Sequence, residues 1–172
     1  MLKAKDTSVR SSCLSRPTGA IIVRDHRIIA AGYNGALPGV SDCMSEGGCY
    51  RRVSRLKEGK EDKYLGCKSS HAEMNAIAFA AKFGVPIDNC EMYVTLYPCS
   101  NCSKLIATSG IKKVFYELGY ESGNAERDAE WKKELQNYKV ATEKVNLTEF
   151  DKLKALDMII NITSSRRLKP TG

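Results

Sequence analysis

Two short motifs carry the residue types in this chain that are best suited to chemistry: His71-Ala72-Glu73 and Pro98-Cys99-Ser100-Asn101-Cys102. By itself the CxxC spacing is ambiguous, because it fits a redox pair, half of a zinc site or chance. His71 favours zinc, since one histidine and two cysteines make three ligands and leave a fourth position open. That ligand set is typical of a catalytic zinc, which lowers the pKa of a bound water to about 7.

Glu73 stands two residues after His71, where its carboxylate can approach a metal-bound water and shuttle the proton of that water. The alternative is structural. Ser70 and Glu73 also have the spacing of a capping box, in which the glutamate would only accept a hydrogen bond from a backbone N–H. That alternative leaves Cys99 and Cys102 unexplained, so we expect Glu73 to be catalytic.

The elements that must position these motifs follow from hydrophobic patterning. A β-hairpin is predicted at 20–31, with His26 at its turn, and strands are predicted at 92–96 and 113–116. A helix that is buried nearly all round is predicted at 71–83, and a second helix runs from the CxxC motif to Ala107. A third helix is predicted from a capping box at Thr148 onward, with the apolar residues Phe150, Leu153, Leu156 and Ile160. Both motifs then lie at helix N-termini, and the fold class is an α/β sandwich around a mixed sheet.

The composition excludes several classes of protein. A chain of 172 residues with 42% hydrophobic and 27% charged residues is expected to form one domain, 1–172, with a Cys-rich basic insert at about 36–70 and a basic tail at about 164–172. Its apolar runs are far shorter than the ~20 residues of a membrane-spanning helix. The N-terminus shows no secretory signal, so we expect a cytoplasmic protein whose seven cysteines are metal ligands or buried thiols.

The formal net charge of +7 invites a nucleic-acid interpretation, but it is confined to two segments. Residues 50–68 contribute +4 and the C-terminal tail +3, so the rest of the chain is neutral. Both segments fit either solvated surface or attraction for phosphate, whether of a nucleotide or of a nucleic acid. Because the charge is confined to these two segments, a nucleic-acid substrate is not expected.

The two motifs match the H-x-E…P-C-x-x-C signature of zinc deaminases. Over roughly residues 11–120 the chain resembles deoxycytidylate (dCMP) deaminases in particular. The resemblance is carried by Gly32-Tyr33-Asn34-Gly35, by HAEMNAI at 71–77 and by MYVTLYPC at 92–99. It implies a cytidine-deaminase-like three-layer α-β-α sandwich, a homohexamer, and hydrolysis of dCMP to dUMP and ammonia by a zinc-activated water, with Glu73 as the proton shuttle.

The resemblance also implies roles for other residues. Asn34 is expected to touch the deoxyribose, the Ala72 amide the pyrimidine carbonyl, and the loop Gly32, Tyr33, Asn34 and Gly35 the effectors dCTP and dTTP. Arg16 and Lys82 are candidates for phosphate contacts, each with a solvated charge as the alternative. Tyr97 could pack on the base or equally in the core.

Four further cysteines, Cys13, Cys43, Cys49 and Cys67, have the count of a closed structural zinc site. Such a site would order an insert that holds too few apolar residues to order itself. Scattered thiols are the alternative.

Two other functions remain open for the whole protein. One is a deaminase that acts on adenosine in tRNA or another nucleic acid, which the basic charge favours. The other is a non-catalytic metal-binding homologue, and the intact Glu73 argues against it.

Overall fold

The computed structural model describes residues 1–49, 67–119 and 125–157. Five strands form one sheet in the order β2-β1-β5-β6-β7, namely β2 (Arg27–Tyr33), β1 (Gly19–Arg24), β5 (Glu91–Leu96), β6 (Lys113–Leu118) and β7 (Ala141–Lys144). β1 runs antiparallel to both β2 and β5, whereas β5, β6 and β7 run parallel. The sheet is therefore mixed, as the sequence predicts.

The predicted hairpin is formed by β1 and β2. Asp25 and His26 connect the two strands, and both have positive φ angles, of 50° and 61°. Turns of this left-handed kind match the right-handed twist of the strands they connect. His26 is thus a turn residue.

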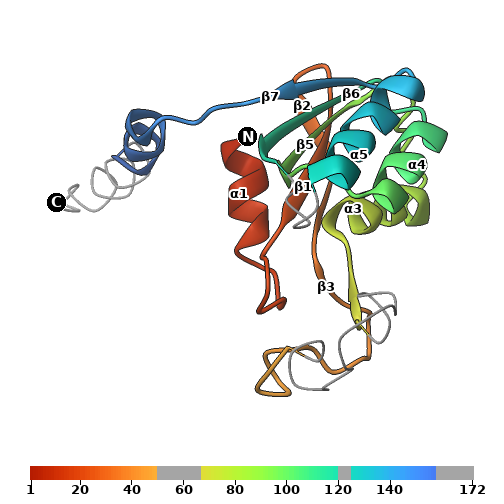
Figure 1. The fold of residues 1–172 in the computed structure, drawn as a ribbon. Helices are drawn as coiled ribbons and strands as arrows, with labels where there is room; N and C mark the ends of the chain where they lie inside the picture. Colours follow the sequence, from red (N-terminus) through yellow and green to blue (C-terminus); the bar gives the residue numbers. More distant parts are fainter. Residues whose placement is uncertain (50–66, 120–124, 158–172) are drawn as a thin grey trace, which may run out of the picture.

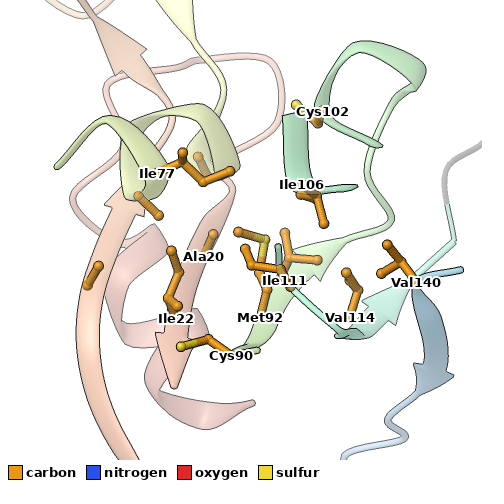
Figure 2. Packing of buried hydrophobic residues seen from close by; sticks show 14 of the residues in the cluster. Ala20, Ile22, Ile77, Cys90, Met92, Cys102, Ile106, Ile111, Val114 and Val140 are labelled. Carbon is orange, nitrogen blue, oxygen red and sulfur yellow. The ribbon is translucent and has the colours of Figure 1, made fainter. Parts of the chain in front are cut away.

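Three helices cover one face of the sheet: α3 (Ala72–Lys82), α4 (Ser100–Thr108) and α5 (Ala125–Asn137) (Figure 1). Alternate residues of the strands face them, and Ile22, Met92 and Val114 are fully buried. Figure 2 shows Ile77 of α3 and Ile106 of α4 pointing toward these strand residues, with Cys102 at the edge of the same core. The core therefore continues directly into one of the chemical motifs.

The opposite face of β1 is covered by α1 (Leu2–Ser8). Gly19 allows this packing, because a Cβ atom there would collide with the backbone of Ala4 and Ser8. Ala4 is completely buried as a result. With α1 on one face and three helices on the other (Figure 1), the predicted three-layer α-β-α sandwich is confirmed.

The predicted insert leaves the domain and returns to it at one point. Its two ends form a small antiparallel sheet of β3 (Gly35–Ala36) and β4 (Ser69–Ser70), with Gly35 opposite Ser70 and Ala36 opposite Ser69. This pairing places His71 immediately after an anchored strand. Most of the insert's basic charge, and the whole basic tail at 164–172, lie outside the described residues.

The helix at 71–83 is not buried all round, which corrects the expectation from its Ala-rich sequence. Its outer face is exposed, including Phe79 at 47% and Phe83 at 60%.

The C-terminal helix is confirmed at residues 149–157, where Thr148 Oγ1 accepts a hydrogen bond from the backbone N–H of Asp151. That helix stands away from the sheet on an extended connection (Figure 1), and Phe150, Leu153 and Leu156 are exposed. Ile160 lies outside the described residues.

Five elements were not predicted: α1, β3, β4, α5 and β7. The α5 sequence AERDAEWKKELQN is strongly charged and gives little hydrophobic signal, although Leu135 within it is fully buried. No helix among the described residues is long and apolar enough to cross a membrane.

Candidate metal centre and active site

Two helix N-termini bring the chemical motifs together. His71 is the N-cap residue of α3, Cys99 is the N-cap residue of α4, and Cys102 lies in the first turn of α4. His71 Nδ1 is 3.5 Å from Cys99 Sγ and 3.3 Å from Cys102 Sγ. Within the described part of the chain, these three residues form the one group whose ligand atoms gather within 4.8 Å of one another.

The dimensions of this cluster fit a tetrahedral zinc ion. With Zn–S bonds of about 2.3 Å and Zn–N bonds of about 2.0–2.1 Å, tetrahedral angles place a nitrogen and a sulfur ligand about 3.6 Å apart. The two observed N···S distances are close to this value. Three ligands leave one coordination position for a water or a substrate.

The local electrostatics favour a thiolate at this cluster. A hydrogen bond from Cys102 lowers the pKa of Cys99 to about 4, against the smaller opposing effect of burial. The pKa of Cys102 is raised, because Cys102 is the partner that shares its proton with Cys99 and because it is buried. This hydrogen bond favours the thiolate form of Cys99, and the thiolate is the form that binds metals.

Glu73 lies in the first turn of α3, only 4% exposed, next to the cluster. Burial raises the pKa of its carboxyl group to about 7. The capping-box alternative is not realised, because the N-cap of α3 is His71 and no side chain makes a cap hydrogen bond there. A buried carboxyl group with a pKa near neutrality can both accept and donate a proton.

Ala72 is the first residue of α3 and is completely buried. The backbone N–H groups of a first helical turn have no acceptor within the helix. The Ala72 N–H therefore has no acceptor within α3, and its contact with a substrate carbonyl stays a prediction.

Asn34 is buried at the end of β2, where its side chain holds the segment that precedes β1. Asn34 Oδ1 accepts hydrogen bonds from Ser11 Oγ (2.6 Å) and from the backbone N–H of Thr18 (2.7 Å). Its Nδ2 donates to the Arg16 carbonyl at 2.8 Å. One N–H of this amide is left for a ligand, so Asn34 is first a structural residue of the site.

The segment Gly32 to Gly35 is not a loop, which corrects the expected conformation, while effector binding by these residues stays a prediction. Gly32 and Tyr33 belong to β2, and Gly35 begins β3. The reason for Gly32 is packing, since a Cβ atom there would collide with the Ala72 carbonyl and the Ala76 nitrogen of α3. Tyr33 contributes its carbonyl, which accepts a hydrogen bond from Asn75 Nδ2 at 2.8 Å.

The two candidate phosphate contacts have different outcomes. Arg16 lines an open pocket of about 590 Å³ at the carboxyl ends of β5 and β6, with Lys5 and Lys144 also on its walls. Lys82 is at the opposite end of α3 from His71, about 16 Å away at 1.5 Å per residue. Lys82 is therefore too distant for the predicted contact, and its ammonium group lies 5.6 Å from the Phe83 ring centroid.

Tyr97 is a core residue, which decides between its two predicted roles. It is 3% exposed, it meets Tyr116 edge-on at 4.8 Å between ring centroids, and its hydroxyl donates to the Lys132 carbonyl at 3.2 Å. Burial raises the pKa of this hydroxyl to about 12. Tyr97 faces α5, so the prediction that it packs on the base is wrong.

The four other cysteines do not assemble into a second zinc site in the described structure. Cys13, Cys43, Cys49 and Cys67 are free thiols, and no three of them have their sulfur atoms within 4.8 Å of one another. Cys49 is buried, while the other three are partly exposed. The pairing of β3 with β4 holds the ends of the insert together without such a site.

Sequence reasoning missed the contacts that α5 makes with the CxxC segment. Ser100 Oγ donates to Glu134 Oε1 at 3.0 Å, next to the hydrogen bond from Tyr97 to the Lys132 carbonyl. Because Glu134 lies 35 residues after Cys99 on a charged helix, no local pattern points to this contact.

The fold and the cluster at the N-termini of α3 and α4 together define a domain of the zinc-binding deaminase class. Residues 1–118 match the family model described as the cytidine and deoxycytidylate deaminase zinc-binding region, and the chain belongs to this family. The resemblance stated from the motifs is thereby confirmed, as is zinc as the metal of the family.

Several relatives in this family are similar to the chain. ComE operon protein 2 of Bacillus subtilis (strain 168) is 44% identical over 115 residues, which cover 67% of this chain and 55% of that protein. The deoxycytidylate deaminase of Schizosaccharomyces pombe is 41% identical over 111 residues, 64% of this chain and 33% of that protein. The chain therefore spans about a third to a half of the length of these two relatives.

Among solved structures, the dCMP deaminase from cyanophage S-TIM5 in complex with dCMP and dUMP has a TM-score of 0.65 and 32% sequence identity. The match covers 84% of this chain and 92% of that one. A deaminase/reductase from Thermotoga maritima, with a TM-score of 0.58 and 23% identity, shares the fold alone.

Proposed function

We propose that this protein hydrolyses dCMP to dUMP and ammonia. The observation that carries the proposal is Glu73, a buried carboxyl group in contact with a His-Cys-Cys cluster of zinc-binding dimensions. A purely structural zinc site has no use for a proton-transferring group at its open position. The phage dCMP deaminase and the deoxycytidylate deaminases of the family support the choice of substrate.

Each residue of the site has its own role in the reaction. His71, Cys99 and Cys102 hold the zinc ion, which when bound supplies Lewis-acid activation of a water molecule. Glu73 takes one proton from the attacking water and gives it to N3 of the cytosine as the water oxygen bonds to C4. It then moves the second water proton to the amino group, which leaves as ammonia when the C4–N bond breaks. The Ala72 N–H orients the pyrimidine by donating to its carbonyl oxygen, and the remaining Asn34 N–H is available to the deoxyribose.

Recognition of the phosphate group is assigned to Arg16. The Arg16 carbonyl is tied to the Asn34 amide, so the residue is fixed beside the position proposed for the sugar. Its side chain lines a pocket whose walls also carry Lys5 and Lys144. Lys5 on the same walls is paired with Glu117 at 2.7 Å. An anionic phosphate is attracted to such a wall.

We also propose that the protein is a homo-oligomer. The helix at 149–157 exposes Phe150, Leu153 and Leu156 along one face, at 72%, 63% and 54%. A helix this short is marginal in water without packing. Phe79 and Phe83 form a second exposed apolar pair, with ring centroids 4.6 Å apart. A second copy of the chain would supply partners for both surfaces, and light scattering measures the assembly directly.

The decisive test is ammonia release by the purified protein from a panel of dCMP, dCTP, deoxycytidine, CMP and an adenosine-containing tRNA stem-loop. We expect dCMP to have the highest kcat/KM. Activity confined to the stem-loop would instead favour the adenosine deaminase alternative, and no release from any compound by zinc-loaded protein would favour a non-catalytic homologue. Repeating the dCMP assay with dCTP and dTTP present tests the proposed effectors.

A further inference from the structure

We propose that α5 positions the zinc ligand Cys99, with Glu134 as the positioning residue that acts through Ser100. The proposal rests on the zinc site of the proposed function. α5 lies at Ala125–Asn137, beyond residues 1–118 that match the family's zinc-binding region. The inference therefore gives a functional role to a part of the chain that the family match does not cover.

Two hydrogen bonds to acceptors on α5 lie on either side of Cys99, the first metal ligand of α4. On one side of Pro98-Cys99, the Tyr97 hydroxyl donates to the Lys132 carbonyl at 3.2 Å. On the other side, Ser100 Oγ donates to Glu134 Oε1 at 3.0 Å. Since Lys132 and Glu134 are two residues apart on one helix, the segment that carries Cys99 is held at both of its ends by a single rigid element.

The position of Ser100 in α4 explains why this contact matters for the metal. Ser100 is the first residue of α4, directly after the N-cap Cys99 and two residues before Cys102. A displacement of Ser100 therefore moves both sulfur ligands relative to His71, which α3 holds separately.

The chemistry of Glu134 suits this role. A carboxylate near a helix N-terminus interacts favourably with the helix dipole. Its second oxygen, Oε2, is buried and has no hydrogen-bond partner among the described residues. The hydrogen bond from Ser100 is therefore the main interaction that offsets the desolvation cost of burying the Glu134 carboxylate. α5 is itself anchored by Leu135, which is completely buried in the core. The site is thus held through packing that begins in the hydrophobic core.

Zinc affinity tests the proposal, measured by competition with a chromophoric chelator on the full chain. Groups that orient metal ligands from outside the coordination shell typically change metal affinity by 10–100-fold. We expect Ser100→Ala and Glu134→Ala each to weaken zinc binding by about this factor. Glu134→Gln keeps an acceptor oxygen and is expected to restore most of the affinity. The double variant Ser100→Ala/Glu134→Ala should bind zinc about as well as either single variant, because both remove one interaction.

Glu130→Ala is the matched control, since Glu130 is an exposed glutamate on the same helix. Its zinc affinity should equal that of the original protein. In the cobalt-substituted protein, the visible bands of the thiolate-bound ion should change in Ser100→Ala and remain unchanged in Glu130→Ala. This spectroscopic readout reports the ligand geometry, which a general loss of stability would not alter in the folded fraction.

Unchanged zinc affinity and cobalt spectrum in Ser100→Ala would overturn the positioning role of Glu134, even if Glu134→Ala failed to fold. A different result would show that the proposed deaminase function is wrong. A protein that binds one zinc tightly but releases no ammonia from dCMP would overturn the deaminase proposal and leave the role of α5 intact. A protein that binds no zinc would overturn both.

Discussion

Gly32→Ala tests whether the packing of α3 on β2 sets the geometry of the active site. Gly32 faces α3, opposite Ala20 in the β1–β2 pairing. The added Cβ atom would lie 2.9 Å from the Asn75 carbonyl carbon, and closer still to the Ala72 oxygen and the Ala76 nitrogen. All three are backbone atoms of one helix, so no side-chain rotation can relieve the collision.

The displacement can be worked out from these distances. Ordinary contacts of a Cβ atom begin at about 3.4 Å, so the Asn75 carbon alone requires a shift of about 0.5 Å, and the two closer atoms require about 1 Å. The shift falls on the first turn of α3, which carries His71 and Glu73, whereas the cysteine ligands on α4 stay in place. A misplacement of about 1 Å in an active site can cost about 100-fold in rate.

We therefore expect Gly32→Ala to lower kcat/KM for dCMP by about 100-fold and the free energy of unfolding by about 1–3 kcal/mol. Steady-state ammonia release and denaturant unfolding measure the two effects. Ala31→Ser is the control, because it also adds one heavy atom to β2 but on the exposed side of the strand. Full activity in Gly32→Ala would mean that the sheet yields rather than the helix, and would refute the reasoning.

Three other predictions address the reaction and the metal. Glu73→Gln should retain zinc and fold but lose at least about 10²–10⁴-fold in kcat, since an amide cannot relay protons; near-normal turnover measured on the zinc-loaded variant would leave Glu73 without a catalytic role. The protein should hold one zinc per chain by metal analysis, and Cys99→Ser should lose it together with activity; an unchanged metal content would exclude Cys99 as a ligand. Arg16→Ala should raise KM for dCMP and leave kcat/KM for deoxycytidine nearly unchanged, because only the nucleotide carries a phosphate group; equal effects on both compounds would argue for a structural role of Arg16.

The sequence by itself determined the residues of the metal cluster and the elements that hold them. Short motifs are local, and a histidine or cysteine at a helix N-terminus is recognisable from the residues on either side of it. The β1–β2 hairpin was predictable for the same reason, since two alternating strands and their turn lie within 15 residues.

Only the tertiary structure decided the roles that depend on which face of an element meets which neighbour. Tyr97 is two residues before a metal ligand in the sequence, yet its hydroxyl reaches the Lys132 carbonyl of α5, a contact that depends on where the folded chain places α5. Lys82 is on the same helix as His71, but three helical turns separate them. In the sequence Gly32 resembles a loop glycine, but in the structure it is a strand residue whose missing side chain lets the backbone of α3 pack against β2.

The contacts of α5 were beyond sequence reasoning for a further physical reason. A helix with mostly charged and polar residues shows little hydrophobic periodicity, and Leu135 is the one residue of α5 that is fully buried among those described. Ser100 and Glu134 are polar residues of ordinary type, separated by a strand and most of two helices. Their hydrogen bond exists because the parallel pairing of β5, β6 and β7 lays α4 and α5 side by side on one face of the sheet, and that arrangement is set by the folded chain as a whole.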